Sequence, residues 1–455
     1  MPADPSSRMT AREAIALLTG GAGFTEHRPP PRTLPPDGPL GWAGYDAARE
    51  RASARTGEEE SVVYGTGVVG DRACVLLSFE FGFLGGSLGQ LTGDRLEAAY
   101  ELALSRRLPL LALVATGGSR MQEGMVALTQ LQRVAAASTR LRAAGLPQIA
   151  VVRDPTTGGG WATVGAGADV VLALPGAQVG FAGSRVRPPD ADPYAYGAEG
   201  QFAAGQVDAV VPAGELRGTV GRWLRALGPR EAHEAPRSAA PSPRPAVLPP
   251  SGLPASGREA VERARAAQRP RAEAYLADYF TVRLPLHGDR CGGTDPGLLT
   301  GFGLRADGQP VAYVAQCGTP TRPAGYRAAA RTIRLADRLG VPVLTLVDTP
   351  GAANDAEAER AGAGAAIADT FAAIAAARVP VTTLVIGEGG SGGALALAAP
   401  GNTHVTADSY FSVIAPEPAA AILKRAPSET GATADQLRLR PQDLVELGIA
   451  RSIVT

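Results

Sequence analysis

The stretch VTTLVIGEGGSGG, residues 381–393, joins an apolar strand pattern to a glycine-rich turn, and small residues of helical type follow it. A second strand pattern, residues 343–347, runs into the turn Asp348-Thr349-Pro350-Gly351. Helical patterns at 324–339 and 357–377 precede and separate these two strands. Apolar strands that alternate with helices are typical of layered α/β folds.

The first half of the chain repeats this arrangement. Strand 110–114 leads into Thr116-Gly117-Gly118, and an expected helix, a second strand and a second glycine turn follow. Gly159 lies 41 positions after Gly118, and Gly393 lies 42 positions after Gly351. The same order and spacing twice in one chain indicates a duplicated α/β unit.

The helix of the first half is expected over residues 121–144. Met121, Met125, Leu128 and Leu131 recur there at helical spacing, and Gly145 can end the helix.

Composition excludes several classes of function. The chain has 455 residues, of which 44 are basic, 44 acidic and 45% hydrophobic. Zero net charge disfavours nucleic-acid and anionic-membrane binding, and no apolar run reaches the roughly 18 residues that span a bilayer. Lys424 is the only lysine, so no G-x-x-x-x-G-K-[ST] phosphate loop is present. Cys74, Cys291 and Cys317 make neither a disulfide framework nor a zinc site, and no apolar signal segment opens the chain. We therefore expect a cytoplasmic protein without a bound metal.

A proline-rich stretch divides the chain into two halves. Residues 229–254 hold 8 prolines among 26 residues, a composition typical of a linker. We expect an N-terminal extension at 1–44, a first domain at 45–227, a linker at 228–257 and a second domain at 258–455.

The glycine turns predict a site that stabilises anions. A strand that ends in glycines and enters a helix leaves backbone N–H groups free at the positive end of the helix dipole. Two such groups can form an oxyanion hole, in which one donor contributes about 2.7–4 kcal/mol to transition-state stabilisation. A purely structural role in tight turns is the simpler interpretation for one isolated pair, but the duplication favours the functional one.

Three motif matches are interpreted as coincidental. Gly65-Thr66-Gly67-Val68-Val69-Gly70 fits the dinucleotide pattern, but a strand follows it, so we expect a hairpin. Ser391 stands in a G-x-S-x-G pattern, yet the only later histidine, His404, follows by 13 positions, which disfavours a hydrolase triad. The Asp348–Gly351 turn is similar to a GTPase switch, which requires a phosphate loop.

Several motifs together resemble bacterial acetyl-CoA carboxylase carboxyltransferase. The first half is similar to its β subunit in FEFGFLGGS at 79–87, GGSRMQE at 117–123, DPTTGG at 154–159 and FAG at 181–183. The second half is similar to its α subunit in GYR at 325–327, DTPG at 348–351, GEGGSGGA at 387–394 and SVIAPE at 412–417. The resemblance covers about residues 45–215 and 265–450. It implies a fusion of two tandem crotonase-type (ββα-superhelix) domains.

The resemblance also implies the reaction and the residues that carry it. The family moves CO2 from carboxybiotin to an acyl-CoA, and it makes malonyl-CoA for fatty acid biosynthesis when the acceptor is acetyl-CoA. The N–H groups of Gly117 and Gly118 would face the thioester carbonyl, and those of Gly392 and Gly393 the biotin ureido oxygen. Further substrate contacts are implied at Gly85, Gly86, Ser119, Arg120, Gly158, Gly159, Gly351, Gly389 and Gly390. Arg120 and Glu123 would mainly brace the first turn, and biotin itself would be the base.

Partners follow from the same resemblance. The family pairs a β-type with an α-type half across an interface, which implies at least a homodimer. Lys424 lies in Leu-Lys-Arg, unlike the Met-Lys-Met of a biotin attachment site. Biotin is therefore expected on a separate biotin carboxyl carrier protein that a biotin carboxylase charges. No covalently bound cofactor is expected, and the ligands are carboxybiotin and a coenzyme A thioester.

Two other functions remain open from the sequence. A biotin-independent decarboxylase of malonyl or methylmalonyl thioesters would use the same enolate stabilisation. A scaffold without activity is the second, because the β subunit's zinc ribbon is missing before Cys74 and Ala353-Asn354-Asp355 replaces Tyr-Pro-Gly. Acetyl-CoA and propionyl-CoA differ by one methylene, worth about 1–3 kcal/mol in a pocket, and no residue decides between them.

Overall fold

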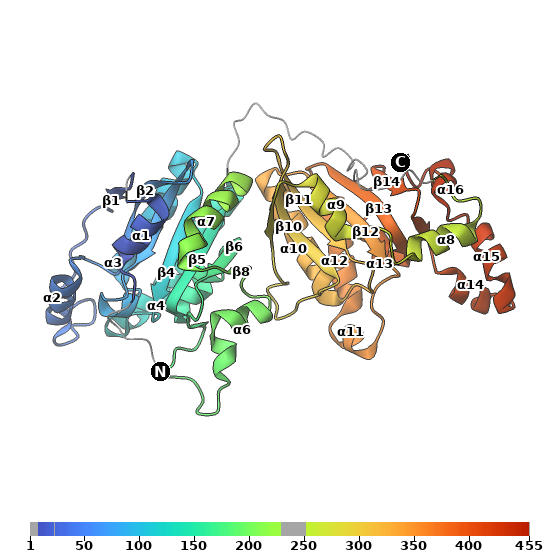
Figure 1. Ribbon diagram of the computed structural model, residues 1–455. Helices are drawn as coiled ribbons and strands as arrows, with labels where there is room; N and C mark the ends of the chain where they lie inside the picture. Colours follow the sequence, from blue (N-terminus) through green and yellow to red (C-terminus); the bar gives the residue numbers. More distant parts are fainter. Residues whose placement is uncertain (1–7, 22, 229–251, 455) are drawn as a thin grey trace. The chain divides into compact units, whose positions relative to one another are not determined.

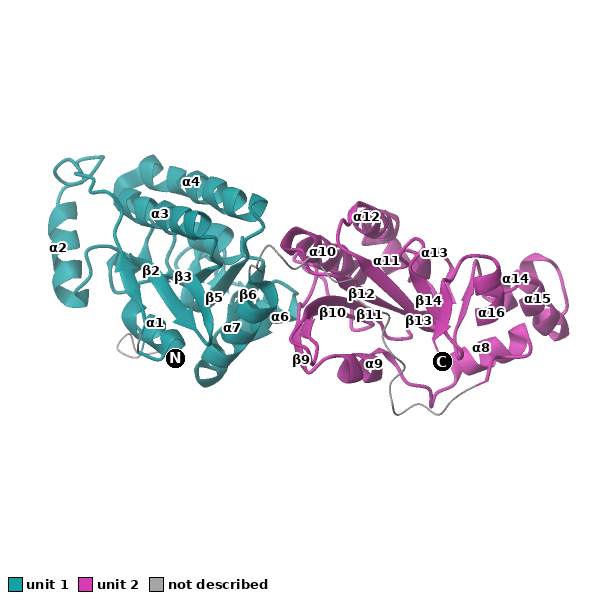
Figure 2. Ribbon diagram, turned by 90° about the horizontal axis from the view of Figure 1, so that it is seen from above, with its two compact units in different colours: residues 1–231 teal, residues 232–455 magenta. Residues whose placement is uncertain are grey.

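The computed structural model describes residues 8–21, 23–228 and 252–454. The chain divides into two compact units, residues 1–231 and 232–455 (Figure 2). Each unit is built on one eight-stranded sheet with helices packed on it. Most of the expected linker, residues 229–251, lies outside the described residues, and the first helix after it begins at Gly257.

The sheet of unit 1 is antiparallel at one edge and parallel elsewhere. Its strands follow the spatial order β1 (Thr25–His27), β2 (Val62–Val69), β3 (Arg72–Phe79), β4 (Leu110–Thr116), β5 (Gln148–Thr157), β6 (Val170–Ala173) and β8 (Ala209–Val210), and β7 (Val179–Gly180) pairs with β5. Strands β3 to β8 run parallel, whereas β1 and β2 run antiparallel to their neighbours. The continuous apolar runs of β3 and β4 are buried because parallel sheets are covered on both faces.

Helices cover both faces of this sheet. Helices α3 (Gln90–Arg106) and α4 (Gly124–Ala143) lie on one face, and α1 (Ala11–Thr19) and α7 (Ala213–Leu227) on the other (Figure 2). Thr10 caps α1, whose buried face includes Ile15 and Leu18. Residues 11–19 and 25–27, within the expected N-terminal extension, are thus part of the packed unit.

Unit 2 repeats the topology of unit 1 (Figure 1). Its spatial order is β9 (Val282–Pro285), β10 (Leu298–Leu304), β11 (Pro310–Gln316), β12 (Val343–Thr349), β13 (Val381–Gly390), β14 (Thr403–Thr406) and β16 (Ser452–Val454), and β15 (Tyr410–Ser412) pairs with β13. Its helices include α8 (Gly257–Arg265), α9 (Ala272–Tyr279), α10 (Pro323–Leu339), α12 (Ala363–Ala376), α14 (Pro416–Ile422) and α15 (Thr430–Gln436). The same strand order and directions in both units confirm the predicted duplication.

Local structure differs from the sequence-based expectation at two helices. The helix expected over 121–144 begins with a 3-10 turn, Met121–Glu123, and α4 starts at Gly124, where φ is +49°. Met121 and Met125 are 70% and 67% exposed, so the first part of the apolar stripe faces outward, and only Leu131 at its end packs against the core of unit 1. The helix expected over 357–377 is two helices, α11 (Ala356–Arg360) and α12, because Gly362 with φ of +80° interrupts it.

The glycine-rich segment at residues 65–70 forms a hairpin, as expected. Gly65 and Gly67 lie within β2, and Gly70, with φ of +66°, begins the turn into the antiparallel strand β3.

Candidate functional site

The glycine turns lie at the carboxyl ends of two neighbouring parallel strands in each unit. The register between β4 and β5 shifts between Val114 and Thr116, and that between β12 and β13 shifts between Val347 and Thr349. The same irregularity in both units makes their turns equivalent. We call residues 116–120 in unit 1 and 348–352 in unit 2 the first turn, and residues 154–160 and 387–393 the second turn; each turn includes the last residues of its strand.

The backbone N–H groups of the first turn donate hydrogen bonds within their own unit. Gly117 donates its N–H to the Gly85 carbonyl at 2.9 Å, and Gly118 donates to Thr116 Oγ1 at 3.0 Å. In unit 2, Gly351 donates to Thr349 Oγ1 at 3.2 Å. The N–H groups of Gly117 and Gly118 are therefore already bonded within unit 1, which corrects the expectation that they face the thioester carbonyl.

The second turn does present free donors. It enters a short helix in both units, Gly158–Gly160 in unit 1 and Ser391–Leu395 in unit 2. Among the described residues, no atom accepts a hydrogen bond from the N–H groups of Gly159, Gly160, Gly392 and Gly393. The first N–H groups of a helix have no intrahelical partner, so each unit presents one adjacent pair of donors.

The two second turns share an unusual backbone conformation. Gly158 has φ of +63°, and Ser391, at the equivalent position, has φ of +57°. Residues other than glycine rarely adopt this left-handed backbone region. Ser391 is therefore more strained at its position than Gly158 is at the equivalent position of unit 1.

The other predicted glycines bring the two turns together. A Cβ on Gly158 would lie 2.9 Å from Gly118 Cα, and one on Gly390 would lie 2.0 Å from the Pro350 carbonyl oxygen. A Cβ on Gly86 would lie 2.2 Å from the Ala115 carbonyl oxygen, so Gly86 packs beneath the first turn of unit 1. Gly389 lies within β13 and pairs with Phe411. These glycines are explained by backbone packing alone.

Arg120 braces the first turn of unit 1 from inside. It is 1% exposed, and its guanidinium donates to Glu60 at 3.0 Å from Nη1 and to Ser87 at 3.1 Å from Nε. Glu123 accepts from Tyr45 Oη at 2.5 Å, and Tyr45 in turn accepts from Arg120 Nη1.

The charges of this cluster depend on one another. Burial opposes the ionised form of Glu60, but the charge and hydrogen bonds of Arg120 bring the pKa of Glu60 below its usual value. Every Arg120 nitrogen has a partner within the unit, so Arg120 is a bracing residue and not the substrate contact that was also expected. Ser119 forms a backbone bridge to Leu88 beside it.

A second charged cluster, which the sequence analysis missed, holds the turns of unit 2. Asp348 is fully buried at the end of β12 and accepts from Arg269 Nη2 at 2.6 Å and from Arg271 Nη1 at 3.1 Å. Its Oδ1 also accepts the Glu388 N–H at 3.2 Å, which ties the first turn to the second. The available signal was an acid in an apolar strand together with the arginine-rich segment 263–271, since buried acids need cations.

Ser391 has no histidine partner among the described residues that would make it a nucleophile. It is exposed at the start of the short helix α13 (Ser391–Leu395), whereas His404 lies in the interior in β14. The His404 ring bonds Ser452 Oγ at 2.8 Å, and burial lowers the pKa of His404. In the described part of the chain, no cluster of three or more His, Cys, Asp or Glu residues is placed to hold a metal ion.

Both halves match known protein families. Residues 38–210 match the carboxyl transferase domain, and residues 255–455 match the acetyl co-enzyme A carboxylase carboxyltransferase-like family. The chain is 38% identical to the acetyl-coenzyme A carboxylase carboxyl transferase subunits beta/alpha of Saccharopolyspora erythraea, over 95% of this chain and 75% of that protein. Its identity to the protein of the same name in Salinispora arenicola is 39%, over 98% of this chain and 82% of that protein.

Solved structures share the fold. The chain resembles a transcarboxylase 12S crystal structure, described as a hexamer, with a TM-score of 0.80 and 22% identity over 98% of this chain and 86% of that one. It also resembles a single-chain, multi-domain long-chain acyl-CoA carboxylase with a TM-score of 0.74 and 20% identity, over 98% of this chain and 45% of that one. These likenesses confirm the two-domain crotonase-type fold. None of the described helices is long and apolar enough to cross a bilayer.

Proposed function

Since the chain belongs to the acetyl-CoA carboxylase carboxyltransferase family, with a β-type half fused ahead of an α-type half, we propose that it carboxylates acetyl-CoA to malonyl-CoA. The carboxyl group comes from carboxybiotin, which a separate carrier protein delivers and a biotin carboxylase regenerates. The three cysteines are free thiols, which supports a reducing compartment such as the cytoplasm.

The observation that carries this proposal is the equivalent pair of free donors in each unit. Removal of an α-proton from a thioester creates an enolate, and release of CO2 from carboxybiotin leaves a negative ureido oxygen. Each anion needs two preorganised N–H groups, and one such donor contributes about 2.7–4 kcal/mol. Gly159 and Gly160 take the thioester oxygen in place of Gly117 and Gly118, and Gly392 and Gly393 take the ureido oxygen.

Exposed apolar side chains beside the second turns support assembly into a homo-oligomer. Phe181 follows β7 and Val413 follows β15 at equivalent positions, and they are 72% and 73% exposed. Met125 and Leu128 on α4, together with Met121 in the 3-10 turn before it, add an exposed apolar stripe in unit 1. Large apolar groups that gather on a surface usually mark an interaction site.

The test is the reverse reaction with purified protein, malonyl-CoA and free biotin. The expected result is loss of CO2 from malonyl-CoA that requires biotin and yields carboxybiotin and acetyl-CoA. Loss of CO2 at the same rate without biotin would contradict the transferase and support the decarboxylase. No turnover, together with no calorimetric binding of malonyl-CoA, would support the scaffold. Parallel rates with methylmalonyl-CoA establish which acceptor is preferred.

A further inference from the structure

The second turn of unit 2 has one anchored side chain. Between Gly387 and Gly393 only Glu388 and Ser391 are not glycine, and Ser391 is exposed. The Glu388 carboxylate accepts from Arg265 Nε at 2.8 Å and from Tyr410 Oη at 2.8 Å. The position of this glycine-rich segment, which ends in the donors Gly392 and Gly393, therefore depends on the strand pairing of β13 and on what holds the Glu388 side chain.

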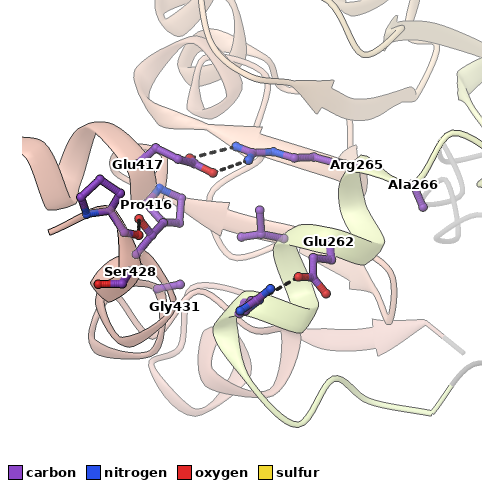
Figure 3. Close-up of a pocket in the computed structure, with 12 residues that line it drawn as sticks. Glu262, Arg265, Ala266, Pro416, Glu417, Ser428 and Gly431 are labelled. Atoms are coloured by element: carbon purple, nitrogen blue, oxygen red, sulfur yellow. Dashed lines mark hydrogen bonds and ion pairs between the residues drawn. The ribbon is translucent and has the colours of Figure 1, made fainter.

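Arg265 connects Glu388 to a second element. It is the last residue of α8, and its Nη1 donates at 2.6 Å to Glu417, in the first turn of α14 (Figure 3). The Arg265 hydrogen bond is the main cause that lowers the pKa of Glu417. The guanidinium thus bridges the second turn and α14, at the edge of a cavity of about 560 Å³ between α8, α14 and α15.

Tyr410 completes the support from the other side. It is 1% exposed in β15, and β15 pairs with β13 at Glu388 itself. The Glu388 carboxylate thus lies between the buried Tyr410 hydroxyl and the Arg265 guanidinium, and the Glu388 backbone N–H donates to Asp348.

Unit 1 has a comparable contact. Asp154 precedes the glycines of its second turn, and its carboxylate accepts from Arg8 Nε at 3.2 Å and from the Gln178 N–H at 3.0 Å. Arg8 lies just before α1, outside the strands of the sheet. In both units an arginine from outside the sheet holds an acidic side chain of the second turn.

We propose that Arg265 is a positioning residue for carboxyl transfer, which acts through Glu388 on the N–H groups of Gly392 and Gly393. The proposal rests on the proposed function, because those N–H groups are the donors for the ureido oxygen. An oxyanion donor works only within a narrow distance of its target, and a displacement of about 1 Å can lower a rate about 100-fold.

The test compares Arg265→Met with wild type in the biotin-dependent reverse reaction. The expected result is a kcat at least about 10-fold lower, with KM for malonyl-CoA and the melting temperature close to wild type. Arg265→Lys should fall between the two, because an ammonium group cannot bridge Glu388 and Glu417 as a guanidinium does. Arg258→Met is the matched control: Arg258 lies on α8 beside the same cavity and pairs at 2.8 Å with Glu262, which does not touch the turn. This variant should keep the wild-type rate.

A double variant distinguishes action through Glu388 from a general effect. Arg265→Met combined with Glu388→Gln should be about as slow as the slower single variant, because both changes release the same anchor. A kcat for Arg265→Met within twofold of wild type, rate losses that multiply in the double variant, or a parallel loss of melting temperature and malonyl-CoA affinity would each overturn the proposal. Absence of biotin-dependent transfer in the wild type would instead remove the proposed function on which it rests.

Discussion

Replacing Arg120 by methionine removes the cation that pairs with Glu60 and Glu123 inside unit 1. The side chains of all three residues are at most 1% exposed, so water cannot replace the lost partner. Breaking a buried ion pair by removing one partner costs about 3–5 kcal/mol, because the remaining charge is left in a low dielectric. We expect the free energy of unfolding of unit 1 to fall by that amount at pH 7.

The measurement uses the protein's own fluorescence. All three tryptophans, Trp42, Trp161 and Trp223, belong to unit 1, so urea unfolding followed by tryptophan emission reports this unit. Arg140→Met is the control, since Arg140 and its partner Glu101 are about half exposed. It should cost no more than about 1 kcal/mol. An Arg120→Met loss as small as that of the control would refute the reasoning.

The difference in unfolding free energy between wild type and Arg120→Met should also depend on pH, in a direction that the Glu60 pKa determines. In wild type the pKa of Glu60 is lowered, so its contribution to stability is present above the unfolded value of about 4.3 and is lost as pH falls through the folded value. Without Arg120, only the Ser61 N–H and the charge of Arg49 still oppose the effect of burial, so we expect the pKa of Glu60 to rise above the unfolded value. The variant therefore regains stability relative to wild type as pH falls from 7 to 5, and a difference that stays constant over this range would contradict the assignment.

Three other expectations follow. Gly393→Ala should lower the melting temperature of the protein, because its Cβ would lie 2.4 Å from the Ala352 nitrogen, whereas Gly392→Ala meets nothing within 4 Å. Gly392→Ala should instead stay folded and lose about 100-fold in kcat of the reverse reaction, because its methyl group fills space beside the donors; equal behaviour of the two variants would contradict this. Ellman's reagent at pH 8 should modify Cys291 first, since it is exposed, while burial raises the pKa of Cys317 to about 11 and that of Cys74 to about 12. A fast-reacting thiol that persists in Cys291→Ser would contradict the prediction that Cys291 reacts first. Phe181→Asp should reduce the oligomer mass in sedimentation without loss of melting temperature, and an unchanged mass would remove Phe181 from the proposed contact.

The alternation of strands, turns and helices could be predicted because apolar periodicity is a local property. The repeated spacing of Gly118 to Gly159 and Gly351 to Gly393 was enough to predict a duplicated fold. Which amides are free could not be predicted, because the acceptor of Gly117 is the carbonyl of Gly85, which is remote in sequence. The spacing of Met121 and Met125 indicates a helix but not the side of it that meets the sheet.

The arginine partners of the acidic residues that hold the turns could not be predicted for the same reason. Asp348 receives Arg269 and Arg271, and Glu388 receives Arg265, across long sequence separations. A sequence shows that an acid lies in an apolar strand and so must be paired. Only the packing of α8 against β13, and of α9 against β11, β12 and β13, selects the partner.

Tryptophan and lysine are distributed unevenly between the two units, which allows the separation of the units to be followed by fluorescence. Lys424, the only lysine, is exposed just after α14 in unit 2, and its ε-amine offers one side-chain attachment point for an amine-reactive acceptor dye. The tryptophans of unit 1 then serve as intrinsic donors. Resonance energy transfer between them follows the separation of the two units in solution, and titration with malonyl-CoA or biotin records how each ligand changes it.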